Sequence, residues 1–133
     1  MEVCIIGTGY VGLVTGVCLS RLGHKVTCID QVKKNISLLS KGTVPFHEPL
    51  LEEMLKENIQ SGNISFSSSY KKACQNNIIF ICIDTPAMKN GDADLSNISK
   101  CLQSLKNNLQ HDALIIVKST VPVGTTDIIS DKL

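Results

Sequence analysis

Short, uninterrupted apolar runs alternate along this chain with longer segments in which apolar residues recur at helical spacing. The runs lack the polar–apolar alternation of a sheet with one solvated face, so they are typical of strands buried on both faces. The run at 78–83 is the most apolar and is predicted to be central, whereas 64–66 is predicted to be peripheral. We predict strands at residues 3–6, 26–29, 64–66, 78–83 and 113–117, the last of them also buried.

The segments with helical spacing carry recognisable stop signals and apolar stripes. Ile98, Leu102 and Leu105, for example, lie on one face of a helix. Gly23 and Gly42 follow the last periodic residues of two segments, where glycine commonly ends a helix. We predict helices at residues 11–22, 32–39, 50–59, 70–74 and 95–109, a turn at Asn90–Gly91, and a further helix that begins after Pro122.

This alternation of strands and helices predicts an α/β fold, in which a doubly wound parallel sheet carries helices on both faces. Right-handed crossovers lead to the expected strand order 3-2-1-4-5, counted along the chain. A length of 133 residues fits one domain, so a single domain over residues 1–133 is predicted. A complete dinucleotide-binding sheet has a sixth strand, and the chain is expected to be truncated before it.

The charge balance excludes several classes of partner. Lys and Arg number 13 against 12 Asp and Glu, so no strong field attracts nucleic acid or an anionic membrane surface. No apolar stretch approaches the ~18 residues that a membrane span needs, and the amino terminus lacks the features of a signal peptide. We therefore expect neither nucleic acid nor a membrane as a partner.

Six cysteines are scattered through apolar and helical segments, and no two of them form a C-x-x-C pair. We interpret them as reduced thiols that behave as small apolar side chains, which is typical of a cytoplasmic protein. The three His form no cluster either, so no metal site is predicted. His24 and His47 are interpreted as structural or solvated rather than catalytic.

A glycine motif, G-x-G-x-x-G, lies between a predicted strand and a predicted helix. Gly7 allows a tight turn, Gly9 lets a diphosphate approach the backbone, and Gly12 lets the helix pack closely. The helix start offers unpaired N–H groups and a positive dipole end to phosphates. This context predicts a Rossmann-type dinucleotide site; the alternative is that the glycines serve only turns and packing.

Asp30 lies at the end of the second predicted strand. A carboxylate there can accept hydrogen bonds from both hydroxyls of an adenosine ribose, and it repels the 2′-phosphate of NADP. We therefore predict NAD as the cofactor, the alternative being that Asp30 is a solvated loop acid. Asp30→Ala is expected to weaken NAD binding and to leave the fold intact.

Two further loops follow neighbouring strands and are expected beside the glycine motif. Thr85 follows the fourth strand and Thr120 the fifth. Their hydroxyls can form hydrogen bonds near the nicotinamide, unless they only cap their own loops. Lys118 is interpreted as a solvated or ion-paired edge residue rather than a catalytic lysine.

Several segments resemble the nucleotide-sugar dehydrogenases of the UDP-glucose/GDP-mannose family, and they occur in that family's order. They are GTGYVGLVTGVCLSRLGHKV from Gly7, PFHEP from Pro45, FICIDTP from Phe80, NGDADLS from Asn90 and VKSTVPVGTT from Val117. The last segment is the most specific, because it is similar to the UDP-glucose branch rather than to the GDP-mannose branch.

The resemblance implies an NAD-dependent enzyme that oxidises the C6 alcohol of a nucleotide sugar to a carboxylate. In the UDP-glucose branch this turns UDP-glucose into UDP-glucuronate, for polysaccharide biosynthesis, by two hydride transfers to NAD and a thioester on a cysteine. The catalytic Cys, Lys, Asn and Asp, the central helix and most of the UDP-sugar pocket are expected beyond residue 133. The chain alone is therefore expected to be inactive, with none of its cysteines as the nucleophile, and the full-length protein is expected to be a homo-oligomer.

The resemblance also assigns roles to single residues. Thr120 matches a residue that faces the nicotinamide and helps to position a catalytic water. Together with the residues chosen above from motif and strand position, the expected cofactor-binding set is Gly7, Gly9, Tyr10, Val11, Gly12, Asp30, Asn35, Thr85, Pro86 and Thr120.

Three positions depart from the family pattern. Asn35 stands where a basic residue is common, which leaves open whether Lys33 or Lys34 makes that contact. Leu50 replaces the Gly of the family's E-P-G-L loop, so we expect this loop to be built differently. Ala87 stands where some members have a cofactor-contacting Thr. We therefore expect the isolated chain to bind NAD weakly.

The sequence leaves other functions open. A UDP-N-acetyl-sugar or GDP-mannose dehydrogenase would differ mainly outside this chain. A noncatalytic module that senses NAD or NADH and signals through a partner would have the same glycine motif. A hydroxyacid dehydrogenase is disfavoured by residues 119–124.

Overall fold

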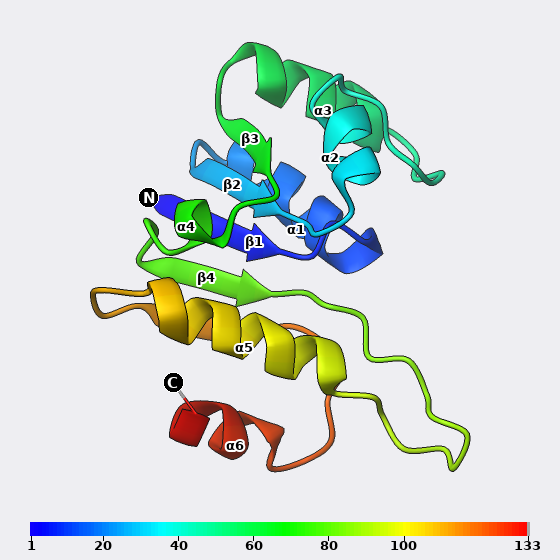
Figure 1. Ribbon diagram of the computed structural model, residues 1–133. Helices are drawn as coiled ribbons and strands as arrows, with labels where there is room; N and C mark the ends of the chain where they lie inside the picture. The colour runs from blue at the N-terminus through cyan, green and yellow to red at the C-terminus, as the bar shows by residue number, and fades with distance from the viewer. Residues whose placement is uncertain (133) are drawn as a thin grey trace.

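The computed structural model describes residues 1–132, which form one parallel sheet with helices on both faces (Figure 1). Five strands lie in the order β3-β2-β1-β4-β5, which confirms the predicted α/β topology. The elements in chain order are β1 (Glu2–Ile6), α1 (Tyr10–Arg21), β2 (Lys25–Ile29), α2 (Lys33–Leu39), α3 (Leu51–Gln60), β3 (Ile64–Ser67), α4 (Tyr70–Ala73), β4 (Ile78–Ile81), α5 (Ser96–Asn108), β5 (Leu114–Val117) and α6 (Thr125–Lys132).

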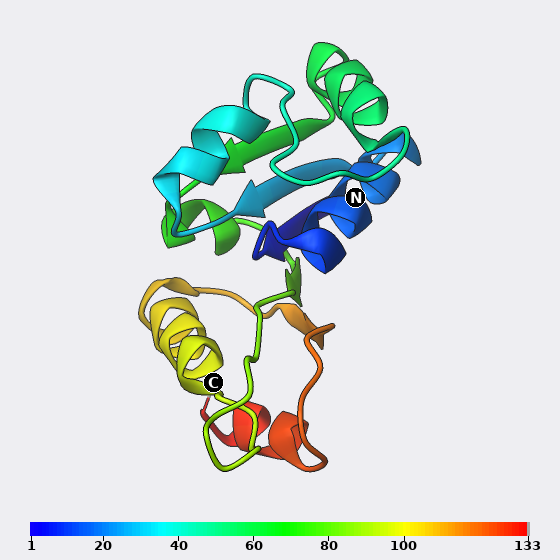
Figure 2. The same cartoon turned by 90° about the vertical axis from the view of Figure 1, so that its right-hand side faces the viewer.

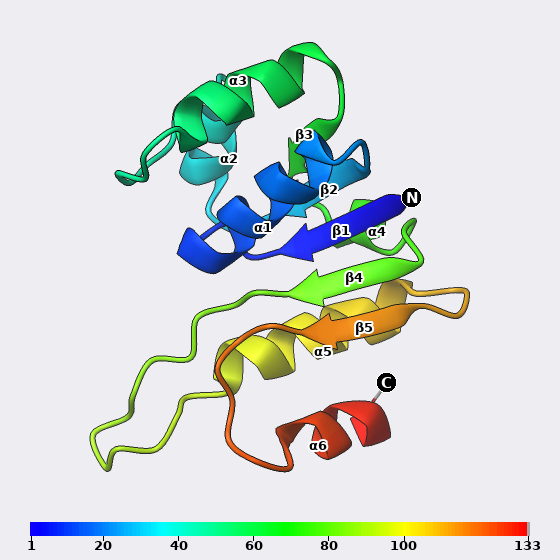
Figure 3. The same ribbon diagram turned by 180° about the vertical axis from the view of Figure 1, so that it is seen from behind.

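β1 lies at the centre of the sheet and sends its side chains alternately to the two faces. Val3 and Ile5 join the apolar cluster that includes residues of α1 and α3, while Cys4 and Ile6 join the cluster that includes residues of α4 and α5. Figure 1 shows α4 and α5 in front of the sheet, and Figure 3 shows α1 and α3 in front from the opposite side. Figure 2 shows the sheet between α1 and α5. The apolar run of β1 is therefore a strand covered on both faces.

The parallel registers bring the carboxyl ends of the strands to one edge of the sheet. Ile6 of β1 lies opposite Ile29 of β2 and Ile81 of β4, and Ile81 lies opposite Val117 of β5. The loops that follow these four strands consequently start side by side. Because β2 and β4 flank β1 on opposite sides, this edge contains the switch point where ligands bind in doubly wound sheets.

The structure differs from the predicted strands at β4 and β5. β4 ends at Ile81 rather than at residue 83, although the N–H of Cys82 still donates to the carbonyl of Ile6 at 2.8 Å. The prediction that the fifth strand is buried is wrong: Leu114 is 60% exposed and the rest of β5 is half-buried. The physical reason is position, since β5 lies at the edge of the sheet and has a neighbouring strand on one side only.

A long excursion connects β4 to α5 (Figure 1). An isolated antiparallel β-bridge between Ala87 and Ala93 joins the two arms of this connection. The predicted turn lies at its tip, where Gly91 has a φ of 89° and its N–H donates to the carbonyl of Met88 at 2.9 Å. A left-handed φ explains the glycine at this position.

Leu50 stands at the N-cap of α3 in the left-handed conformation, with φ 65° and ψ −11°. It has the only positive φ of any non-glycine residue in the described part of the chain. Leu50 thus adopts a backbone conformation that favours glycine. The expectation that the loop is built differently from the family's E-P-G-L loop stays a prediction. The side chain is 70% exposed and offers little packing in return.

Leu50→Gly should raise the free energy of unfolding by about 0.5–1 kcal/mol. The left-handed conformation costs a residue that has a β-carbon about 1–2 kcal/mol. This strain exceeds the entropic cost of folding a glycine in place of another residue, which is about 0.5–1 kcal/mol. Urea denaturation measures the change. Leu22→Gly is the matched control, because Leu22 is 75% exposed and has a φ of −75°. Destabilisation by both variants would contradict the assignment of strain to Leu50.

Candidate functional site

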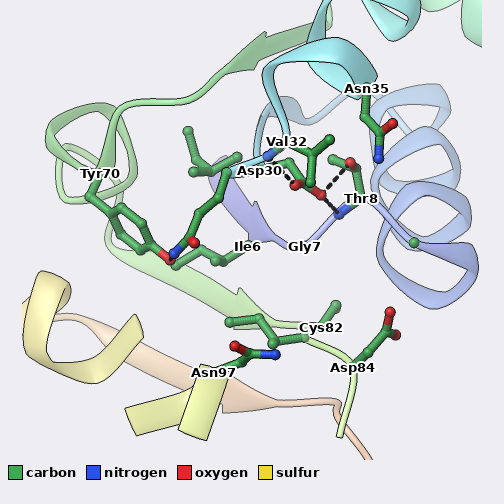
Figure 4. Close-up of a pocket in the computed structure, with 14 residues that line it drawn as sticks. Ile6, Gly7, Thr8, Asp30, Val32, Asn35, Tyr70, Cys82, Asp84 and Asn97 are labelled. Atoms are coloured by element: carbon green, nitrogen blue, oxygen red, sulfur yellow. Dashed lines mark hydrogen bonds between the residues drawn. The ribbon is translucent and has the colours of Figure 1, made fainter. Parts of the chain in front are cut away.

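A cavity of about 290 Å³ opens at the carboxyl edge of the sheet, beside the switch point between β1 and β4 (Figure 4). Its wall combines the glycine loop after β1, the turn after β2 and the start of the loop after β4. The lining residues are Ile6, Gly7, Thr8, Gly9, Ile29, Asp30, Gln31, Val32, Asn35, Tyr70, Cys82, Ile83, Asp84 and Asn97. The structure thus brings the predicted glycine motif and the predicted acid to one cavity.

Two glycines of the motif are required by the backbone itself. Gly7 has a φ of 99°, and a β-carbon there would lie 2.4 Å from the carbonyl oxygen of Cys82. A β-carbon on Gly12 would lie 1.9 Å from the carbonyl oxygen of Gly7. Both distances are far below contact distance, so no other residue fits without displacing the backbone of the loop or of β4.

Gly9 differs from these two glycines, because the nearest atom to a β-carbon built on it is Oδ1 of Asp84, at 3.6 Å. The backbone of Gly9 is extended, with φ −72° and ψ −168°, and is open to any residue. Its missing side chain therefore leaves free space in the cavity rather than relieving a clash. That space adjoins the start of α1, whose N-cap makes no side-chain hydrogen bond and whose first turn has no acidic residue. The N–H groups of this turn are available to an anion.

Asp30 is fixed by three hydrogen bonds to neighbouring loops (Figure 4). Its Oδ2 accepts from the N–H of Thr8 at 2.9 Å and from the hydroxyl of Thr8 at 2.7 Å, and its Oδ1 accepts from the N–H of Val32 at 2.9 Å. A carboxylate has about four acceptor positions, so one remains for a hydroxyl of a ligand. Asp30 joins the glycine loop to the turn after β2, a structural role that the sequence did not reveal.

The other residues predicted to contact the cofactor near Asp30 and the glycine loop differ in whether they line the cavity. Asn35 lines the cavity from α2, whereas Lys33 and Lys34 are exposed and outside its wall. Tyr10 and Val11 are also exposed on α1 and do not line the cavity. The ring of Tyr10 instead stacks on that of Phe46, with centroids 4.0 Å apart. Tyr10 and Val11 are the first two residues of α1, so their side chains lie outside the cavity wall while their backbone belongs to the first turn of the helix.

The loops after β4 and β5 are held together, as their neighbouring strands predict. The hydroxyl of Thr85 donates to the carbonyl of Thr120 at 2.6 Å, and the N–H of Ile83 donates to the hydroxyl of Ser119 at 2.9 Å. Thr85, Pro86 and Thr120 do not line the cavity around Asp30. They lie further along the same edge of the sheet, beyond the glycine loop.

The structure adds residues to the site that the sequence analysis missed. Thr8, Tyr70, Asp84 and Asn97 line the cavity, and Gln31 donates to the hydroxyl of Tyr70 at 3.4 Å. Burial, with a smaller contribution from Cys101, raises the pKa of Tyr70 to about 12, so its hydroxyl stays protonated at neutral pH. Thr8 lies inside the glycine motif, and Asp84 begins the loop that the sequence places beside that motif, so both could have been noticed. No local pattern marks Tyr70 or Asn97.

All six cysteines are free, and five of them are buried. Burial is the main cause that raises the pKa of Cys82 to about 11, and it does the same for Cys101. These thiols are protonated at neutral pH and are therefore poor nucleophiles. In residues 1–132 no group of His, Cys, Asp and Glu is arranged to hold a metal ion, and no helix is long and apolar enough to cross a membrane.

Comparison with known proteins gives a consistent result. Residues 1–133 match the sequence profile described as UDP-glucose/GDP-mannose dehydrogenase family, NAD binding domain. The chain is 45% identical over 131 residues to the UDP-glucose 6-dehydrogenase YwqF of Bacillus subtilis (strain 168), and the match covers 98% of this chain and 30% of that protein. The chain spans about 30% of the length of this relative, and the same share of the UDP-glucose 6-dehydrogenase of Rhizobium meliloti (strain 1021).

Solved structures of related enzymes have the same fold. A ternary complex of GDP-mannose dehydrogenase from Pseudomonas aeruginosa is 35% identical with a TM-score of 0.91, over 99% of this chain and 32% of that one. A UDP-glucose dehydrogenase from the hyperthermophilic archaeon Pyrobaculum islandicum is 32% identical with a TM-score of 0.93, over 98% of this chain and 32% of that one.

Asp30→Ala should lower the free energy of unfolding by about 1–3 kcal/mol, because the N–H of Thr8 loses its acceptor and Thr8 is only 1% exposed. The fold is still expected to form, as the sequence analysis predicts, but with lower stability. Urea denaturation measures the loss. Asp112→Ala is the matched control, because the Asp112 carboxylate makes no hydrogen bond or ion pair within residues 1–132, and its change should stay below about 0.5 kcal/mol. An equal loss of unfolding free energy in both variants would contradict the structural role of Asp30.

Proposed function

Because this chain belongs to the UDP-glucose/GDP-mannose dehydrogenase family and matches its NAD-binding domain, we propose that it is the cofactor-binding part of an enzyme that oxidises UDP-glucose. The enzyme converts UDP-glucose to UDP-glucuronate by two successive hydride transfers to NAD. The residues that act on the sugar belong to the part of the relatives that this chain does not span, so the chain alone has no dehydrogenase activity.

The observation that carries the proposal is the open space over Gly9 at the start of α1. The diphosphate of NAD lies over Gly9 and accepts hydrogen bonds from N–H groups of the first helical turn, including those of Tyr10 and Val11. Gly7 and Gly12 support this arrangement indirectly, since they allow the loop and the helix to approach the sheet. The site therefore uses backbone donors, which explains why the exposed side chains of Tyr10 and Val11 are not needed inside the cavity.

The adenosine ribose lies at Asp30, whose remaining acceptor position receives a ribose hydroxyl. The carboxylate would repel the 2′-phosphate of NADP, and the cavity wall contains no Lys, Arg or His to balance such a phosphate. Asn35, which lines the cavity, takes the place of the basic residue common in the family and offers an uncharged amide. Both features support NAD as the cofactor over NADP.

The nicotinamide lies toward the loops after β4 and β5, near Thr85, Pro86 and Thr120. The bond from the Thr85 hydroxyl to the Thr120 carbonyl holds these loops at a fixed separation. The hydroxyl of Thr120 is exposed and has no hydrogen-bond partner within residues 1–132, so it is available to position a water or the nicotinamide amide. This assignment for Thr120 rests on the family resemblance together with its place at the sheet edge.

The choice of UDP-glucose as substrate has two supports. The segment 117–126 is similar to the UDP-glucose branch of the family. The UDP-glucose 6-dehydrogenase of Bacillus subtilis is 45% identical to this chain. Among the solved structures identity does not separate the branches, because the GDP-mannose dehydrogenase of Pseudomonas aeruginosa is 35% identical and the UDP-glucose dehydrogenase of Pyrobaculum islandicum 32%.

Gly9→Ala should weaken NAD binding by more than about tenfold and leave the fold unchanged. The added methyl group fits the unliganded chain, because its nearest neighbour is 3.6 Å away, but it occupies the space assigned to the diphosphate. Calorimetric titration with NAD measures binding, and the urea midpoint monitors folding. Absence of binding by the unaltered chain even at millimolar NAD, or unchanged affinity in the variant, would contradict the proposed cofactor site.

The protein encoded by the whole reading frame should reduce two NAD for each UDP-glucose consumed, and it should prefer UDP-glucose to GDP-mannose and UDP-N-acetylglucosamine. NADH absorbance and chromatography of the sugar product measure both quantities. The 133-residue chain is the control, and it should bind NAD without producing NADH. Preference for GDP-mannose would move the protein to that branch of the family, and lack of any turnover would favour a noncatalytic NAD-binding module.

A further inference from the structure

Asp84 follows β4 and lines the same cavity as Asp30. Figure 4 shows its carboxylate pointing from the end of β4 toward the glycine loop. Its two oxygens lie 3.6 Å and 3.9 Å from the position that a β-carbon on Gly9 would take. A carboxylate therefore borders the space over Gly9, beside the positive end of α1.

The Asp84 carboxylate has no internal partner. Within residues 1–132 it makes no hydrogen bond, and the ion pair found there joins Lys56 to Glu52 instead. The cavity wall holds two carboxylates and no basic side chain, so nothing in the wall balances the charge of Asp84. Asp30 differs, because its oxygens accept three hydrogen bonds.

The backbone around Asp84 is held in place on both sides. The N–H of Ile83 donates to the Ser119 hydroxyl at 2.9 Å, and the hydroxyl of Thr85 donates to the Thr120 carbonyl at 2.6 Å. The loop cannot move away from the glycine motif without breaking these bonds to the segment after β5. The backbone of Asp84 is thus held at the edge of the cavity.

We propose that Asp84 is an internal anion that competes with the cofactor's diphosphate for the positive end of α1 and so lowers the affinity of the domain for NAD. The proposal rests on the placement of the diphosphate over Gly9 given under the proposed function. Two like charges separated by a few ångströms at a solvated surface repel each other enough to change a binding constant about fivefold to tenfold. Asp84 is then a determinant of affinity that acts through charge alone.

Repulsion by the Asp84 charge predicts which ligands are affected. Only ligands with phosphate groups at the start of α1 should be affected, whereas a ligand that reaches Asp30 alone should not. ADP keeps the diphosphate of NAD, and adenosine lacks it. Comparing these two probes separates repulsion at the diphosphate from a general change in the cavity.

The test uses the chain with Asp84→Asn, which removes the charge and keeps the size of the side chain. The dissociation constants for NAD and ADP should fall about fivefold to tenfold, measured by calorimetry, while that for adenosine, measured by NMR titration, should not change. Asp112→Asn is the matched control, since it removes the same charge at the opposite, amino-terminal side of β5 and should alter none of the three constants. If Asp84→Asn does not fold, Asp84→Ser provides the same comparison.

The outcomes are distinct. Unchanged NAD affinity in Asp84→Asn would overturn the proposal, and so would an equal gain with adenosine or in the Asp112→Asn control. Weaker NAD binding would also overturn it, because Asp84 would then be accepting a hydrogen bond from the cofactor. If Gly9→Ala binds NAD like the unaltered chain, the diphosphate placement itself fails; if only Asp84→Asn has no effect, that placement stands and the role of Asp84 alone is rejected.

Discussion

The contact between the first turn of α1 and the carboxyl ends of β1 and β4 is the constraint on which this site depends. Gly12 lies so close to the carbonyl of Gly7, and Gly7 so close to the carbonyl of Cys82, that neither position has room for a β-carbon. These two close backbone contacts hold α1, the glycine loop and the end of β4 together. They also hold the start of α1 at the edge of the sheet, so that the positive end of the helix lies beside Gly9.

Two acids in this cavity illustrate how surroundings decide the role of a residue type. Asp30 accepts hydrogen bonds from two loops, and its charge therefore contributes to the stability of the unliganded fold. Asp84 carries the same charge without any such donor in the described residues, and its oxygens face the glycine loop. Cofactor affinity then reflects a balance between backbone donors at the helix start and a carboxylate beside them.

Much of the fold could be predicted because the central strands β1, β2 and β4 are largely buried, and buried strands appear in a sequence as short apolar runs. The order of the strands followed from short right-handed crossovers, and the cavity followed from placing Gly7–Gly12 and Asp30 at the same sheet edge. The burial of β5 could not be predicted in the same way, because an edge strand and a central strand have similar composition. The conformation of Leu50 escaped prediction as well, since leucine rarely adopts a positive φ.

The sequence by itself determined the elements, their order and the chemistry of the glycine loop, because hydrophobic period and glycine spacing are local properties of the chain. Only the tertiary structure decided which polar groups meet. Thr8 reaches Asp30 across 22 positions and Thr85 reaches Thr120 across 35, separations at which no local pattern specifies a partner. The same holds for Asp84, which faces Gly9 because parallel pairing brings the ends of β1 and β4 together.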